Sequence, residues 1–326
     1  MRLILHIGKA KTGTTSLQSF LYSNRSHLEA QGFRLLDSAG SPNNVGLAVV
    51  FSTAGPSAAS YWHRERGIRS EAEKRKFLQE TRFMEEIIRE IRASPAHCHT
   101  LILTSEQLWE RLRGEEIEQF AQWCRINFTE CQVVLYLRDQ VELATSRWSM
   151  QVKAGNHLSL RRSVSKLLSI SPSADSDRLK QWSQFFGKIP SVNIYRGSGA
   201  WDVRSHFAEK FMPKVEGLAF PPTSDNRSYG KVSIHIVRLV NALFLAWTWK
   251  AEGKQPYIKA RARLRSRLLA FLRPVIELDK SRLRLSRKRA SMVREHFREA
   301  NSEMSRIYLN GDHLTAPPEP RNLEQR

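Results

Sequence analysis

The segment that most constrains the fold is an apolar run followed by a loop of glycine, lysine and threonine. Residues 3–7 are apolar apart from His6, which is typical of a buried strand. The loop GKAKTGTTS (residues 8–16) comes next, and residues 15–31 then carry Leu and Phe at helical spacing up to Gly32. A strand, a glycine-rich turn and a helix at the start of the chain predict an α/β domain.

Further apolar runs alternate with helical patterns along the chain. Strands are predicted at residues 33–36, 100–104, 132–137 and 191–195, and helices at residues 71–93, 114–128, 140–154 and 202–211. Residues 37–70, rich in Gly, Ser, Pro and Asn, are predicted to be a long surface loop. This alternation predicts a P-loop-like three-layer α/β fold with a central parallel sheet.

The predicted topology also places the ligand. In a parallel sheet the carboxyl ends of the strands lie at one edge, and ligands bind beyond that edge. The loops at residues 8–15, 105–106 and 138–139 each follow a predicted strand. We therefore expect these three loops to converge on one site.

The chain changes character after about residue 229. No further clear strand is present, and residues 250–298 hold 16 Lys and Arg against four acidic residues, net +12 of the +20 carried by the whole chain of 326 residues. We predict an α/β core at residues 1–228, a helical C-terminal part of the same domain at 229–316, and a flexible tail at 317–326. Such a charge favours an anionic partner.

The basic segment leaves four interpretations open. It can be a solvated amphipathic helix packed on the sheet domain, a surface that attracts an anionic glycan or lipopolysaccharide, or a peripheral membrane contact. Nucleic acid is the fourth, disfavoured because no recognised reader motif accompanies the charge.

The cysteines and the N-terminus indicate a compartment. Cys98, Cys124 and Cys131 are an odd number without a CxxC pair, which favours a reducing environment. The first apolar run is too short for a signal peptide, and no run has the length of a membrane span. These features predict a cytoplasmic protein, with the inner face of the membrane as a place of contact.

The loop at residues 8–16 has the composition of a phosphate cradle. Backbone N–H groups before a helix can bind phosphate, and Gly8 and Gly13 let the backbone approach it closely. In the nucleotide triphosphatase pattern G-x-x-x-x-G-K-[ST], Gly8, Gly13 and Thr15 fall correctly, but Thr14 occupies the lysine position and the lysine is Lys11. This departure disfavours hydrolysis of a magnesium–nucleotide triphosphate. The alternative is an ordinary glycine turn.

The segment HIGKAKTGTTSLQSFL resembles the 5′-phosphosulfate loop of sulfotransferases that use 3′-phosphoadenosine-5′-phosphosulfate (PAPS). In that family K-[ST]-G-T-[TS] after a strand binds the 5′-phosphate, and its lysine contacts the oxygens near the sulfuryl group. The resemblance implies that Lys11 is this lysine. It assigns the 5′-phosphate to Thr12, Gly13, Thr14, Thr15 and Ser16.

A second segment, YLRDQVELATSRW, is similar to the family's 3′-phosphate site, an Arg at a strand end and a Ser eight residues on. Arg138 and Ser146 have this spacing. NRSYGK, residues 226–231, is similar to the third cofactor segment but departs from its R-K-G-x-x-G-D-W-K form. The resemblance, closest to the bacterial carbohydrate-type branch, covers the first 150 residues and implies PAPS as co-substrate and no metal.

Transfer of a sulfuryl group also needs a base for the acceptor hydroxyl. Glu106 follows a predicted strand at the edge where the phosphate loop opens, and several glycan sulfotransferases use a Glu in this role. Its alternative is a structural role as a helix cap or ion-pair partner. His6 and His63 are the other candidate bases. His97-Cys98-His99 lacks the spacing of a zinc site.

The sequence therefore predicts an enzyme, a PAPS-dependent sulfotransferase acting on a hydroxyl, with a glycan as the expected acceptor. Lys11 would stabilise the leaving group and Glu106 would deprotonate the acceptor. A P-loop-type small-molecule kinase and a non-catalytic anion- or nucleic-acid-binding protein are the alternatives.

Overall fold

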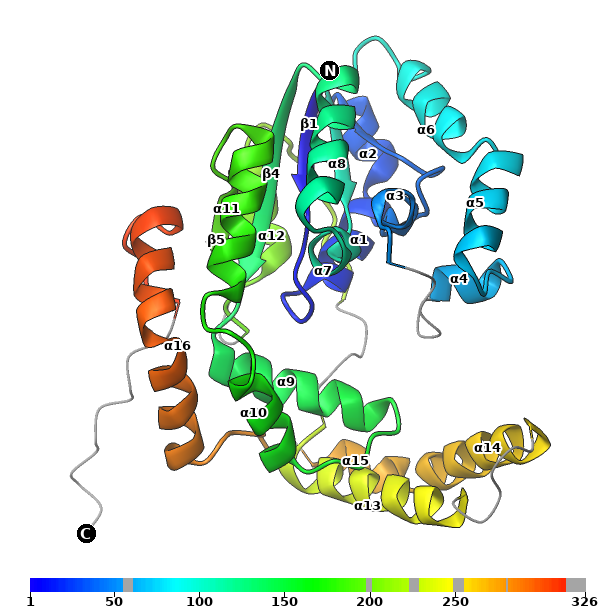
Figure 1. Cartoon of the computed structure of the whole chain (residues 1–326), viewed down its shortest axis with the longest axis vertical. Coiled ribbons are helices and arrows are strands. Elements are labelled where there is room, and N and C mark those ends of the chain that lie inside the picture. The colour runs from blue at the N-terminus through cyan, green and yellow to red at the C-terminus, as the bar shows by residue number, and fades with distance from the viewer. Residues whose placement is uncertain (55–60, 198–200, 223–228, 249–254, 280, 315–326) are drawn as a thin grey trace. The chain divides into compact units, whose positions relative to one another are not determined.

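A five-stranded parallel sheet lies at the centre of the α/β part of the chain in the computed structural model (Figure 1). The structure describes residues 1–54, 61–197, 201–222, 229–248, 255–279 and 281–314. The strands are β1 (Arg2–His6), β2 (Phe33–Leu35), β3 (Thr100–Thr104), β4 (Glu130–Leu137) and β5 (Ser191–Ile194), in the order β2-β3-β1-β4-β5. The predicted strands and the α/β class with a parallel sheet are confirmed.

Alternate residues of the strands face two separate apolar layers, as the pleat of a strand requires. Leu3 and Leu5 of β1 pack in the layer built with α8 (Gly114–Asn127) and α11 (Ala174–Phe186). Ile4 packs in the opposite layer, with α1 (Thr14–Ser23) and α12 (Val203–Phe211). The sheet is therefore covered on both faces, which explains why its strands are continuous apolar runs.

Two helices predicted as continuous are interrupted. Residues 15–31 form α1 and α2 (Arg25–Ala30), and residues 71–93 form α5 (Glu71–Glu80) and α6 (Phe83–Arg92). The first break lies at Asn24, whose amide nitrogen donates to the Phe20 carbonyl (2.9 Å) and to the Ala219 carbonyl (2.8 Å). Because Ala219 is distant in the sequence, the helical spacing of residues 15–31 carries no sign of this contact.

The prediction of one long loop over residues 37–70 is wrong for part of that range. It contains α3 (Val45–Phe51) and α4 (Tyr61–Glu65), while residues 55–60 lie outside the described residues. Leu47, Ala48 and Val49 of α3 are almost fully buried in the same layer as α8. The Gly, Ser and Pro content around α3 obscured an apolar segment that is needed to complete the core.

The chain forms two compact units that interleave along the sequence. Unit 1 contains Met1–Arg138, Ser173–Ser224 and Ser302–Leu314, and includes the sheet and α7 (Glu106–Arg111). Unit 2 contains Asp139–Pro172 and Asp225–Asn301. Its helices are α9 (Gln140–Lys153), α10 (Leu160–Leu168), α13 (Lys231–Thr248), α14 (Gln255–Phe271), α15 (Arg273–Leu278) and α16 (Arg287–Tyr308) as far as Asn301.

Unit 2 has its own apolar clusters. Trp148 and Val152 of α9 pack with Ile234 and Val237 of α13. A second cluster joins α9 and α10 to α16. The predicted division at residues 228/229 cuts the chain once, whereas each of these units contains several separate segments; the predicted division stays a prediction. The predicted tail at 317–326 lies outside the described residues.

Among the described helices, none combines the length and the hydropathy that a membrane crossing requires.

Candidate functional site

The loop between β1 and α1 has a backbone that alternates in handedness. Gly8, Lys11 and Gly13 have positive φ angles of 53°, 72° and 78°. A Cβ atom on Gly8 would lie 3.0 Å from the Glu106 Cα, and one on Gly13 would lie 2.8 Å from the Tyr195 Cε2. The glycines are therefore required both by conformation and by close neighbours.

Lys11 is the unusual member of this set. A positive φ costs a non-glycine residue on the order of 1–2 kcal/mol, because its Cβ crowds the carbonyl oxygen. Such conformations occur often at binding loops, where the surrounding structure holds them. Concave loops in which left-handed residues alternate with right-handed ones direct successive N–H groups at a common point and bind anions.

Helix α1 continues this arrangement. It begins at Thr14, its N-cap Gly13 provides no side-chain acceptor, and its first turn contains no acidic residue. Its first N–H groups and the positive end of its dipole therefore remain available to an anion. This is the donor set that binds a phosphate at a helix N-terminus.

Glu106 is brought to the loop from the end of β3. It is the first residue of α7 and is half-buried. The Thr14 hydroxyl donates a hydrogen bond of 2.8 Å to Glu106 Oε2. The loop at residues 8–16 and the candidate base are thus directly joined, as the convergence of strand ends predicts.

Arg138 reaches the same loop from the end of β4. Its Nη1 donates to the Lys11 carbonyl oxygen at 3.1 Å. Its guanidinium carbon lies 5.1 Å from the centre of the Tyr195 ring, at the end of β5. Arg138 therefore fixes the backbone of the loop at the position where φ is strained, while its planar group is stacked on an aromatic ring.

Lys11 lies in the electrostatic field of both neighbours. Burial lowers the pKa of its ammonium group, the positive charge of Arg138 lowers it further, and the Glu106 carboxylate opposes the shift. The charged form of a lysine beside a second cation is destabilised unless an anion compensates for the repulsion. The group is therefore poised to gain from a bound anion.

The other predicted phosphate ligands differ in where their hydroxyls lie. Thr12 is fully buried, and its hydroxyl donates to the Lys9 carbonyl at 2.6 Å. Thr15 is exposed and Ser16 is half-buried. Thr12 therefore shapes the loop in this structure, whereas Thr15 and Ser16 have hydroxyls with access to solvent.

Ser146 lies on α9 in unit 2, half-buried. Its part in a 3′-phosphate site stays a prediction. In the third predicted segment, Asn226 and Ser228 lie outside the described residues, and Lys231 is the first residue of α13.

Two residues of the site were not found by sequence reasoning. Lys9 is almost completely buried and forms an ion pair with Asp175, the second residue of α11. The two are 166 residues apart, and no local pattern links them. Tyr195 could have been found from the sequence, because it is the last residue of the strand predicted at residues 191–195 and so lies at the same edge of the sheet.

The two histidines considered as bases are both buried. His6 Nδ1 and the Thr104 hydroxyl are 2.8 Å apart, and burial lowers the pKa of His6 to about 3. Burial also lowers the pKa of His63, with Arg111 and Lys74 adding to the shift. His6 is therefore a neutral core residue at pH 7, held by a neighbouring strand.

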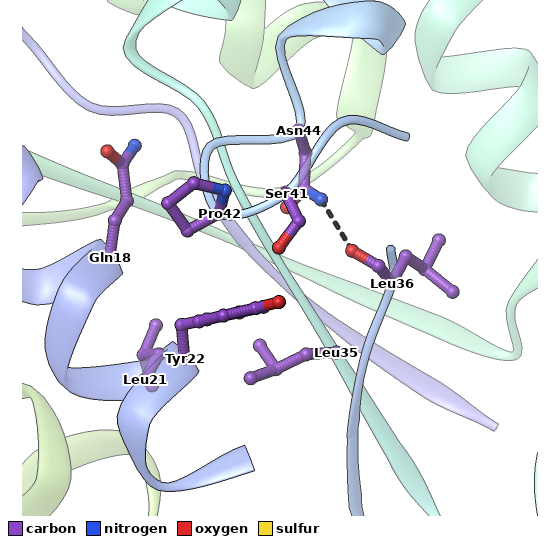
Figure 2. A pocket seen from close by; sticks show the side chains of 8 residues that line it. All are labelled: Gln18, Leu21, Tyr22, Leu35, Leu36, Ser41, Pro42 and Asn44. Carbon is purple, nitrogen blue, oxygen red and sulfur yellow. Dashed lines mark hydrogen bonds between the residues drawn. The ribbon is translucent and has the colours of Figure 1, made fainter. Parts of the chain in front are cut away.

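A small pocket lies elsewhere in unit 1, between α1, β2 and the following loop (Figure 2). Its lining includes Gln18, Tyr22 and Pro42, and Asn44 donates to the Leu36 carbonyl at its rim. The cavity, about 10 Å³, is at the lower limit for one water molecule. It is too small for a nucleotide or an acceptor.

Within the described ranges, no group of three or more His, Cys, Asp and Glu side chains is arranged to hold a metal ion. Comparison of the chain with protein-family models, with curated proteins and with solved structures finds no match.

Proposed function

We propose that the protein is a PAPS-dependent sulfotransferase with a P-loop-like fold, which moves a sulfuryl group to a hydroxyl. The observation that carries the proposal is the hydrogen bond from Thr14 to Glu106. It joins a loop suited to a 5′-phosphate to a carboxylate suited to a base. Lys11 lies under the influence of that same carboxylate.

The loop fits the anionic end of PAPS. Gly8, Lys11 and Gly13 give it the backbone of an anion cradle, and the N-terminus of α1 is not capped by a side chain. Thr15 and Ser16 add hydroxyl donors. Binding here needs backbone groups and one ammonium group, and no metal ion.

Lys11 and Glu106 have different roles in the proposed reaction. Glu106 takes the proton of the acceptor hydroxyl as the acceptor oxygen forms its bond to sulfur. The bond between sulfur and the bridging oxygen of the 5′-phosphate breaks, and Lys11 stabilises the electron pair left on that oxygen. The bond from the Thr14 hydroxyl to Glu106 Oε2 would hold the carboxylate in place for this proton transfer.

Arg138 is assigned to the 3′-phosphate. A guanidinium group offers a planar pair of donors that matches phosphate oxygens. Its bond to the Lys11 carbonyl would couple occupation of the 3′-phosphate site to the shape of the 5′-phosphate loop.

The acceptor is proposed to be a glycan, including an anionic one. The net charge of +20 favours an acidic acceptor over a neutral one. Cys98, Cys124 and Cys131 are all free thiols, which agrees with a cytoplasmic location.

The test is a calorimetric titration with 3′,5′-adenosine bisphosphate, ADP and Mg-ATP in parallel. All three contain adenine and a 5′-phosphate, and only the first has a 3′-phosphate. We expect the bisphosphate to bind at least tenfold more tightly, which corresponds to about 1.4 kcal/mol. A preference for Mg-ATP would indicate a kinase instead, and absence of binding by all three would contradict a nucleotide site.

A further inference from the structure

Helix α13 has two apolar faces, and in the part of the chain that the structure describes only the inner one is covered. Its inner face packs on α9 of unit 2 through Ile234 and Val237, and Asn241 Nδ2 donates to the Val152 carbonyl at 2.7 Å. The outer face carries three apolar side chains at helical spacing that are largely exposed: Val232 at 60%, Leu239 at 56% and Leu243 at 69%.

Helices α14 and α15 repeat the pattern. The Leu272 N–H donates to the Leu268 carbonyl and the Ile276 N–H to the Leu272 carbonyl, both at 3.0 Å, so the helical course continues between the two elements. Leu269, Leu272 and Ile276 pack inward with α9 and α13. The other side exposes Leu264 (44%), Phe271 (80%), Val275 (54%) and Leu278 (79%).

Helix α13 packs against the segment formed by α14 and α15 within unit 2. Arg265 Nε on α14 donates to Asn241 Oδ1 on α13 at 2.8 Å, and the Ser233 hydroxyl on α13 donates to the Ile276 carbonyl on α15 at 3.0 Å. Figure 1 shows α13, α14 and α15 side by side in yellow and orange. The inner contacts account for one side of each helix, and the exposed apolar side chains lie outside them.

The same part of the chain carries most of the positive charge. Residues 250–298 have a net charge of +12. On α14, Arg263 and Arg267 are exposed beside Leu264 and Phe271, and Lys231 is exposed at the start of α13. Exposed Leu and Phe next to Arg and Lys are the composition of helices that lie in the interface of an anionic bilayer.

We propose that the outer apolar side chains of α13 and α14–α15 dock unit 2 on the surface of a bilayer rich in anionic lipid. The apolar side chains enter the boundary between headgroups and acyl chains, and the neighbouring basic side chains remain at the phosphates. This proposal does not depend on the reaction that unit 1 performs.

Two other candidate partners are a second copy of the chain and a nucleic acid. Each is compatible with only one of the two features of this surface, its exposed apolar side chains or its positive charge. A second copy of the chain would bring two strongly positive segments together, and like charges at an interface oppose association. A nucleic acid would engage the basic side chains through its phosphates and leave Phe271 and Leu278 exposed to water. An anionic bilayer satisfies both features.

The experiment measures co-sedimentation of the full chain with vesicles of phosphatidylcholine alone and of phosphatidylcholine with 30% phosphatidylglycerol. Two double variants remove apolar area without touching the inner faces: Leu239→Ser with Leu243→Ser, and Phe271→Ser with Leu278→Ser. Ile126→Ser on α8, exposed at 75%, is the matched control. Thermal unfolding of each variant shows whether it is folded. If one double variant does not fold, the other is sufficient for the test.

We expect binding to the anionic vesicles only, weakened by salt and reduced roughly tenfold or more in each double variant. The Ile126→Ser control should bind like the wild type. Anionic vesicle binding that is equal in the wild type and both double variants would overturn the proposal, because charge alone would then suffice. Absence of binding to the anionic vesicles would also overturn the proposal. Self-association of the chain or binding to a nucleic acid duplex would then identify the partner of this surface.

Discussion

The Thr14 hydroxyl donates to the Glu106 carboxylate at 2.8 Å, although the two residues are 92 positions apart. Thr14 begins α1 and Glu106 begins α7. Each of these helices follows a parallel strand, so their first residues meet at the carboxyl edge of the sheet. This bond joins the loop at residues 8–16 to the carboxylate on which the proposed reaction depends.

Glu106→Gln is expected to abolish sulfuryl transfer while leaving affinity for 3′,5′-adenosine bisphosphate within a few-fold. The amide can still accept the Thr14 hydrogen bond, but it cannot take a proton from the acceptor. Transfer is measured with labelled PAPS and a panel of glycans, and binding by calorimetry. Glu86→Gln, an exposed change on α6, is the control. Retained transfer would move the role of base to another residue.

Lys11→Ala is expected to lower turnover by roughly two orders of magnitude or more without unfolding the protein, because it removes the cation proposed to stabilise the leaving oxygen. Turnover and melting temperature are measured together. Lys76→Ala, on the exposed side of α5, should change neither. Activity within a few-fold of wild type would contradict the assignment of the loop.

Arg138→Ala is expected to weaken binding of 3′,5′-adenosine bisphosphate by at least tenfold, since a charge-assisted bond to phosphate contributes about 1.5–3 kcal/mol. Binding of ADP, which lacks the 3′-phosphate, should change less. Titration of both nucleotides separates the two contributions. An equal loss for both would show that Arg138 does not contact the 3′-phosphate.

Asp175→Asn is expected to destabilise the fold by about 3 kcal/mol, because it leaves the ammonium group of Lys9 buried beside a neutral amide. Urea denaturation measures the change. Asp177→Asn on the same first turn of α11, with its side chain 57% exposed, should cost below about 1 kcal/mol. Equal effects would mean that the Lys9–Asp175 pair contributes no more than a surface pair.

His6 is expected to make the fold less stable in mild acid. Its pKa is about 3 in the folded chain and about 6.5 for an unburied histidine, so the unfolded chain binds the proton more readily between these limits. The free energy of unfolding should therefore fall by about 2 kcal/mol between pH 7.5 and pH 5 through this group.

His6→Gln removes the titrating group and should remove this part of the pH dependence. Urea denaturation at pH 5, 6 and 7.5 measures it in the wild type and the variant. A pH profile unchanged by His6→Gln would mean that other groups cause the loss.

Much of the frame of the site follows from local patterns in the sequence. The apolar runs at β1, β3 and β4, each followed at once by polar residues, are sufficient to place the phosphate loop, Glu106 and Arg138 at one edge. Because the geometry of a strand or helix fixes which positions share a face, the spacing of apolar residues indicates which face is buried. Helix α9 and the glycine that follows it were predicted within one residue for the same reason.

The tertiary structure alone decided which distant groups meet. The break of the first helix depends on the contact of Asn24 with Ala219, the burial of Lys9 depends on Asp175, and the Thr12 hydroxyl is directed to the Lys9 carbonyl by the path of the loop. Pairings such as Lys9 with Asp175 leave no periodic trace, because they arise from how the strands are ordered and not from neighbouring residues. The sequence by itself determined which apolar runs form the sheet and where each strand ends. The tertiary structure determined the burial of α3 and the partners of each polar side chain, because both depend on residues far apart in the chain.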